Sequence, residues 1–132
     1  MPGVWFCPVF AFDLDGDGVD EIWYVNNVSP QHQIGLSGYR LERLDAQTGA
    51  TTGQWPWPNL GDTQTLSFTF RHFILGGHVG GEPVLITGCG TYGDILLRGW
   101  RADMSLRWEN QLKRLGIPGI GAAGSHMCAI AD

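Results

Sequence analysis

The sequence predicts an all-β protein, a β-propeller fragment with about two four-stranded antiparallel blades and the first strand of a third. Three observations predict this fold. Short stretches rich in β-forming residues recur along the chain and are separated by glycine. A pattern of paired apolar strands returns after roughly sixty residues, a spacing that fits propeller blades. Strands that reach a tryptophan occur in both halves, as expected of outer strands that pack between neighbouring blades.

The expected strands are short, and each is bounded by turn-forming residues. They cover residues 9–12, 21–25, 39–45, 65–70, 83–88, 94–100 and 104–109. Residues 65–70 alternate strictly, which places Leu66, Phe68 and Phe70 on one face of their strand. Residues 109–115 are the one stretch that favours a helical turn, and we expect the glycines and proline after it to end that turn.

Internal repetition organises these strands into units. FAFDLDGDGVDEIWYV and FILGGHVGGEPVLITG share an apolar strand, a glycine-rich turn and a glutamate that opens the next strand. Glu21 therefore corresponds to Glu82, an offset of 82 − 21 = 61 residues. VFAFD at 9–13 and CAIAD at 128–132 correspond at an offset of 132 − 13 = 119 residues. RLDAQTGATTGQW and GWRADMSLRW both run from a strand through a polar turn to a tryptophan-bearing strand, so each unit holds four strands.

The repeat sets the predicted domain boundaries. We expect blade one at about residues 5–58, blade two at about 64–110 and the start of blade three at about 126–132. Propellers typically have about four to eight blades, so two cannot close a ring. We therefore expect the remaining blades to belong to a longer parent protein. On this interpretation GSHM at 124–127 is repeat sequence, despite its resemblance to a cloning remnant.

Composition excludes several classes of function. Hydrophobic residues make up 43% of the chain and charged ones 16%, with 20 glycines and six tryptophans, a composition typical of an ordered, turn-rich protein. The net charge of −5 provides no basic surface for nucleic acid. No segment approaches the roughly 20 apolar residues of a membrane helix, and the first residues do not resemble a signal peptide. Cys7, Cys89 and Cys128 lack the CxxC spacing of a zinc site.

The stretch DLDGDGVDE at 13–21 places five carboxylates in nine positions, which disfavours a folded loop unless a cation lies among them. Calcium binds six to eight oxygen ligands, and acids at alternate positions of a tight loop supply three from one side. The candidate ligands are the carboxylates of Asp13, Asp15 and Asp17, the carbonyl of Val19, and the carboxylate of Glu21 or, in its place, Asp20. We expect this calcium to staple the hairpin and not to take part in catalysis. Blade two has GGHVGG at this place, so one site per two blades is expected.

The region from Arg71 to Asp132 resembles the polysaccharide lyases of the rhamnogalacturonan lyase type, family 11. The resemblance rests on RHFILGGHVGGEPVLITGCGTYGDILLRGW, on RWE and on GSHMCAIAD, and DLDGDGVDEI resembles their recurring calcium loop. Ulvan lyases are a neighbouring possibility. The resemblance implies a calcium-binding propeller that is secreted or periplasmic in the parent protein. It also implies cleavage of a uronate-containing polysaccharide by β-elimination.

β-Elimination needs a cation on the uronate carboxylate and a base near the operating pH. The candidate catalytic residues are Arg71 and His72 beside the hairpin, Tyr92 in a glycine-flanked turn, and His126 before the last strand. Trp57 is the candidate for stacking on sugar rings, because Trp55 is expected to pack between blades. We expect the fragment alone to be inactive.

Two other interpretations stay open. A non-catalytic, calcium-stapled propeller module for adhesion or carbohydrate binding has the same blade motifs as a lyase. A quinone-dependent dehydrogenase would share the turn LDAQTG, but the acidic loop counts against it.

Overall fold

The computed structural model describes residues 8–27, 39–57, 72–89 and 95–112, which form eight strands and no helix. The first sheet contains β1 (Val9–Phe12), β2 (Glu21–Asn27), β3 (Tyr39–Leu44) and β4 (Thr51–Pro56), and the second contains β5 (His72–Val79), β6 (Glu82–Cys89), β7 (Ile95–Trp100) and β8 (Leu106–Leu112). Within each sheet consecutive strands pair antiparallel in sequence order. The prediction of two four-stranded antiparallel units is confirmed. Neither sheet closes on itself.

Several sequence predictions concern residues outside the described ranges. The expected strand at 65–70 and the start of a third blade at 126–132 lie outside the described residues. In the part of the chain that is described, no helix is long and apolar enough to cross a membrane.

Two local predictions were wrong. Residues 109–112 are not a helical turn, because they pair with β7 as the end of β8, with Arg98 opposite Glu109. The stretch GGHVGG at 76–81 is not a turn throughout, because β5 continues through Gly76 and Gly77 and pairs His78 with Pro83. The turn itself consists of Gly80 and Gly81, both with positive φ, the backbone conformation that a two-residue hairpin needs.

The two sheets repeat the same plan. Glu21 begins β2 and Glu82 begins β6, as the offset of 61 residues predicts. The pairing of the last two strands shifts register in both sheets, between Arg43 and Leu44 in the first and between Gly99 and Trp100 in the second. The sequence repeat is therefore also a repeat of strand pairing.

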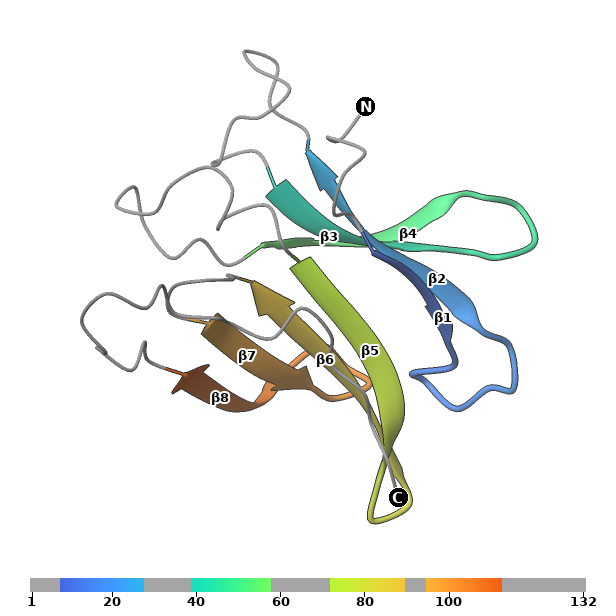
Figure 1. The fold of residues 1–132 in the computed structure, drawn as a ribbon. Coiled ribbons are helices and arrows are strands. Elements are labelled where there is room, and N and C mark those ends of the chain that lie inside the picture. The colour runs from blue at the N-terminus through green and yellow to red at the C-terminus, as the bar shows by residue number, and fades with distance from the viewer. Residues whose placement is uncertain (1–7, 28–38, 58–71, 90–94, 113–132) are drawn as a thin grey trace.

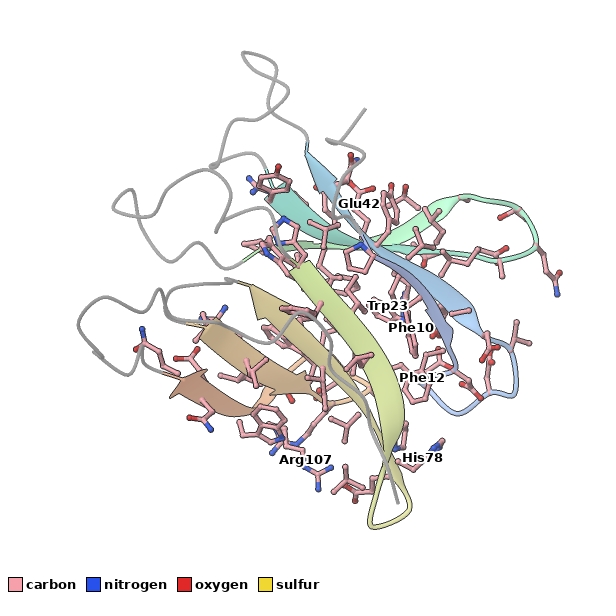
Figure 2. The ribbon with its side chains drawn as sticks, viewed as in Figure 1. Phe10, Phe12, Trp23, Glu42, His78 and Arg107 are labelled. Atoms are coloured by element: carbon pink, nitrogen blue, oxygen red, sulfur yellow. The ribbon has the colours of Figure 1, made fainter. Side chains whose placement is uncertain are left out.

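The sheets meet at their first strands, and β1 and β2 contact β5 (Figure 1). Figure 2 shows Phe10, Phe12 and Trp23 between the sheets, where Phe12 lies against Gly76 of β5. The core consists of Leu14, Trp23, Val25, Tyr39, Leu41 and Trp57 with Ile74, Leu85, Leu96 and Met104, so both sheets contribute to one apolar cluster. Burial of this shared surface holds the two sheets together.

Candidate metal centre

The acidic loop between β1 and β2 folds around the carboxylate of Asp13. The backbone N–H groups of Gly16, Asp17 and Gly18 donate to its two oxygens at 2.7, 3.2 and 2.8 Å. Gly16 and Gly18 have φ values of 79° and 89°, which L side chains rarely adopt. The alternation of aspartate and glycine in the sequence thus produces the turn directly.

Three carboxylates converge in this loop. Asp13, Asp15 and Asp17 each offer one oxygen, and these oxygens all lie within 4.8 Å of one another. Asp15 accepts from the N–H of Asp17 at 3.3 Å, and Asp17 accepts from the N–H of Val19 at 2.8 Å. Each hydrogen bond fixes one side of a carboxylate and leaves other lone pairs for a ligand, because a carboxylate has about four acceptor positions.

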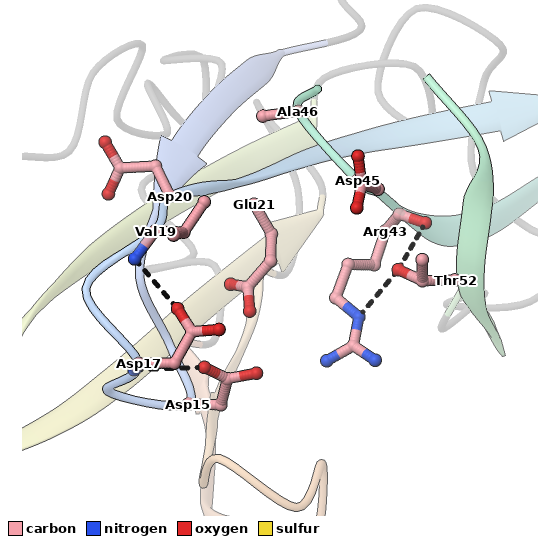
Figure 3. Close-up of a pocket in the computed structure, with 9 residues that line it drawn as sticks. All are labelled: Asp15, Asp17, Val19, Asp20, Glu21, Arg43, Asp45, Ala46 and Thr52. Carbon is pink, nitrogen blue, oxygen red and sulfur yellow. Dashed lines mark hydrogen bonds between the residues drawn. The ribbon is translucent and has the colours of Figure 1, made fainter. Parts of the chain in front are cut away.

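Glu21 approaches the same group from the start of β2 (Figure 3), and its Oε2 accepts from the N–H of Leu14 at 3.1 Å. Burial raises the pKa of Glu21, and the neighbouring Asp15 raises it further, while the Leu14 N–H and Arg43 act in the opposite direction. Positive charge placed near a carboxyl that is held beside other acids stabilises its ionised form.

Arg43 supplies part of that charge in the free protein. It lines a pocket of about 170 Å³ together with Asp15, Asp17 and Glu21 (Figure 3). Its Nε donates to Thr52 Oγ1 at 3.0 Å, and its guanidinium lies 5.8 Å from the ring centre of Trp23 and 5.9 Å from that of Trp55. These contacts hold Arg43 beside the acids and not among them.

The two remaining predicted ligands are the carboxylate of Asp20 and the carbonyl of Val19. The carboxylate of Asp20 points away from Asp15, Asp17 and Glu21 in Figure 3. Val19 donates its N–H to Asp17, and the role of its carbonyl as a ligand stays a prediction. Glu21 is therefore better placed than Asp20 as a further carboxylate ligand. A group of four acids with a hard-oxygen donor set is chemically suited to a divalent cation such as calcium.

The second sheet has no equivalent group in its described residues. Its β5–β6 turn is two glycines long, and the group of three metal-capable side chains found in the described ranges is the one in the first sheet.

The structure places one catalytic candidate and the sugar-stacking candidate together. His72 begins β5, with its ring centre 4.9 Å from that of Tyr39 and 5.0 Å from that of Trp57. His72 and Trp57 are 6% and 7% exposed. Among the described residues, the Trp57 Nε1 and both ring nitrogens of His72 have no hydrogen-bond partner. Burial lowers the pKa of His72 from 6.5 to about 3, so the imidazole is neutral at physiological pH.

The other catalytic candidates, Arg71, Tyr92 and His126, lie outside the described residues.

His72 and the acidic loop lie at opposite ends of the sheets. Phe12, directly before the loop, packs its ring 5.8 Å from that of His78, whereas His72 is six residues away at the other end of β5. At about 3.3 Å per residue the separation is roughly 20 Å. A cation in the acidic loop therefore cannot contact a carboxylate that is bound at His72.

Sequence reasoning missed Arg43 and Leu14. Leu14 is 0% exposed although acids flank it, so it anchors the loop to the core. Its apolar side chain between Asp13 and Asp15 is a signal that could have indicated this role. Arg43 precedes the turn LDAQTG, but its position depends on its pairing opposite Trp23, which the sequence does not show.

Comparison with known proteins adds no assignment, since no family model, curated protein or solved structure matches this chain.

Proposed function

We propose that the loop at 13–21 binds calcium and that the ion staples the β1–β2 hairpin to the core. The convergence of the Asp13, Asp15 and Asp17 oxygens within 4.8 Å is the observation that carries this proposal. Glu21 completes the carboxylate set from the first residue of β2, and Leu14 connects the loop to the buried cluster. The ion neutralises acids whose mutual repulsion otherwise opposes the compact loop.

The parent protein that we propose is a secreted or periplasmic polysaccharide lyase with a β-propeller, in which this chain forms two blades. The paired four-stranded sheets support the blade arrangement, and the resemblance of Arg71–Asp132 to rhamnogalacturonan lyases supports the chemistry. The substrate is a uronate-containing polysaccharide, and cleavage proceeds by β-elimination. The calcium in the acidic loop acts structurally, because the loop is anchored to the buried cluster through Leu14.

One observation favours a second function, a non-catalytic calcium-stapled module for adhesion or carbohydrate binding. His72 is buried and its pKa is lowered to about 3, whereas a general base needs a pKa near the operating pH and access to the substrate. A lyase built on this chain therefore requires its base elsewhere, with Tyr92 and His126 as the remaining candidates.

Calcium binding is tested by titration calorimetry on the whole chain after removal of divalent ions with a chelator. We expect Asp17→Asn to weaken binding by roughly tenfold or more, because a charged ligand of the ion is lost. Asp20→Asn changes the charge equally, but its carboxylate points away from the group, so we expect it to bind nearly as the parent chain does. The same weakening in both variants would show that net charge, and not the loop geometry, attracts the ion.

The two candidate functions are separated by an activity assay on the parent protein with all its blades. A lyase releases unsaturated uronate products, which absorb ultraviolet light, from pectic or ulvan-type polymers. We expect Tyr92→Phe or His126→Gln to abolish this absorbance and His72→Phe to preserve it, since His72 is buried. Binding to a uronate polymer without unsaturated product would support the non-catalytic module.

A further inference from the structure

Two buried side chains that touch where the sheets meet carry three polar atoms without a partner. The atoms are Trp57 Nε1 and both ring nitrogens of His72, and none of the described residues forms a hydrogen bond with them. The two side chains are 7% and 6% exposed, and their ring centres lie 5.0 Å apart with the ring planes at 80°. Trp57 follows β4 of the first sheet and His72 begins β5 of the second, so both sheets contribute.

Comparable polar atoms elsewhere in the structure are paired. Trp23 Nε1 donates to the Phe12 carbonyl at 3.3 Å, and Trp100 Nε1 donates to Thr87 Oγ1 at 2.8 Å. Glu42, which is 4% exposed, accepts from three side chains. Native proteins pair most of their buried polar atoms with protein groups or with ordered water, because an unpaired one costs free energy. Three unpaired atoms on two touching side chains therefore point to a bound partner.

The ring of Tyr39 packs against that of His72, with ring centres 4.9 Å apart, but the Tyr39 carbonyl is not the missing acceptor. It already accepts from the backbone N–H of Trp57 at 3.2 Å and from Arg40 Nη1 at 2.7 Å. A carbonyl oxygen has two lone pairs, so both are in use.

The hydrogen-bonding capacity of the two rings selects the chemistry of the partner. A neutral imidazole has one N–H and one acceptor nitrogen, and an indole has one N–H only. One molecule that pairs the indole N–H with the acceptor nitrogen must both accept and donate, as water does and a carbonyl does not.

Other ligands fit less well. A metal ion on the acceptor nitrogen would leave the indole N–H unpaired, and the metal-capable group in the described ranges lies in the acidic loop. Side chains that are 6% and 7% exposed do not admit a sugar, whereas a water molecule is small enough to be enclosed with them.

We propose that buried water links Trp57 to His72 and so joins the two sheets. One molecule accepts from Trp57 Nε1 and donates to the acceptor nitrogen of His72, and the remaining imidazole N–H donates to the same group of water. Buried waters typically make about three hydrogen bonds to polar groups that the protein leaves unpaired. The link adds a polar contact to an interface that the apolar cluster otherwise forms. It involves neither the calcium loop nor lyase activity, so its test is independent of both proposals.

Nuclear magnetic resonance of the isotope-labelled whole chain tests this link. The indole N–H of Trp57 should show a cross-relaxation peak with water, of the sign that a bound molecule gives. The His72 ring should show one protonated and one unprotonated nitrogen, the pattern of a single fixed tautomer. Trp23 is the matched control, because it is 0% exposed and donates to the Phe12 carbonyl, so its indole N–H should show no water peak.

Two variants separate the link from burial alone. His72→Phe keeps an aromatic ring but should abolish the Trp57 water peak, because buried water needs at least two polar partners. His78→Phe makes the same change at the far end of β5 and should leave the peak in place. Trp57→Phe is the second variant if loss of His72 affects folding, and its His72 ring should interconvert between tautomers. No water peak at Trp57 in the parent chain, or a peak that survives His72→Phe, would overturn the proposal.

Discussion

His72 shows how the environment of one residue decides its chemistry. The same imidazole that would titrate near neutrality in water lies between Tyr39 and Trp57, and burial lowers its pKa to about 3. Protonation would place a charge in the core beside an indole N–H, which is itself a donor and cannot accept the added proton. The residue therefore acts as a packed, neutral ring in the folded protein.

This lowered pKa makes stability depend on pH. Below pH 6.5 the unfolded chain binds a proton at His72 that the folded chain does not bind until about pH 3. Stability is therefore lost as the pH falls through this window, by up to about 1.4 kcal/mol per pH unit. Urea unfolding at a series of pH values should show this slope in the parent chain and a smaller one in His72→Phe.

His78→Gln is the control for the histidine variant, because His78 lies on the surface at the far end of the same strand. It should keep the slope of the parent chain. Glu42, Asp45 and Asp103 have lowered pKa values, so the stability that they contribute is lost near and below their ordinary values of 4.5 and 3.8. The raised pKa of Glu21 acts in the opposite direction and is the same in both chains, so the difference in slope between the parent chain and His72→Phe reports on His72. An unchanged slope between about pH 6 and 5 in His72→Phe would contradict the assignment.

At the scale of elements, the contact of β1 with β5 depends on the absence of a side chain at Gly76. The ring of Phe12 occupies the space where a Cβ would lie. Small residues allow two strands of different sheets to approach closely, and the aromatic ring then fills the interface. The same contact fixes where the acidic loop begins, since Asp13 follows Phe12 directly.

Gly76→Ala should destabilise the protein by roughly 1–3 kcal/mol, because the added methyl group overpacks the Phe12 ring. Chemical denaturation of a double-mutant cycle checks this cause. In the Phe12→Ala background the same substitution should cost much less, since the ring it meets is gone. Equal costs in both backgrounds would place the strain in the backbone of β5 and not in its contact with β1.

At the scale of the whole molecule, the two sheets share one core, and the proposed cation site is attached to it through Leu14. Leu14, Trp23 and Leu85 are each 0% exposed and belong to a single cluster. A ligand that binds the folded state at the loop therefore stabilises both sheets and not the hairpin alone.

Hydrogen exchange checks this coupling. At about one hundred times its dissociation constant calcium should add about 2.7 kcal/mol of stability. The amides of β6, which lie in the other sheet, should gain protection together with those of β2. Protection confined to β1 and β2 would mean that the sheets open independently, and Asp17→Asn should remove the effect in either case.

Much of the fold could be predicted from the sequence, because it follows from local patterns. Short runs of β-forming residues bounded by glycine predicted most of the strands, and the correspondence of Glu21 with Glu82 supported the repeated four-stranded unit. The wrong predictions arose where tertiary pairing overrides local preference. Gly76, Gly77 and His78 read as a turn but are strand residues, and residues 109–112 read as helical but pair with β7.

The sequence by itself determined the acidic loop, since aspartate at alternate positions and glycine between them dictate both the turn and the donor set. Tertiary structure alone decided which residues surround that loop, and that His72 is buried and neutral. Arg43 lies beside the acids because β3 pairs with β2. His72 is buried because Tyr39 of β3 and Trp57, which follows β4, pack against it. Such contacts join residues far apart in the chain, and no local pattern encodes the distance between them.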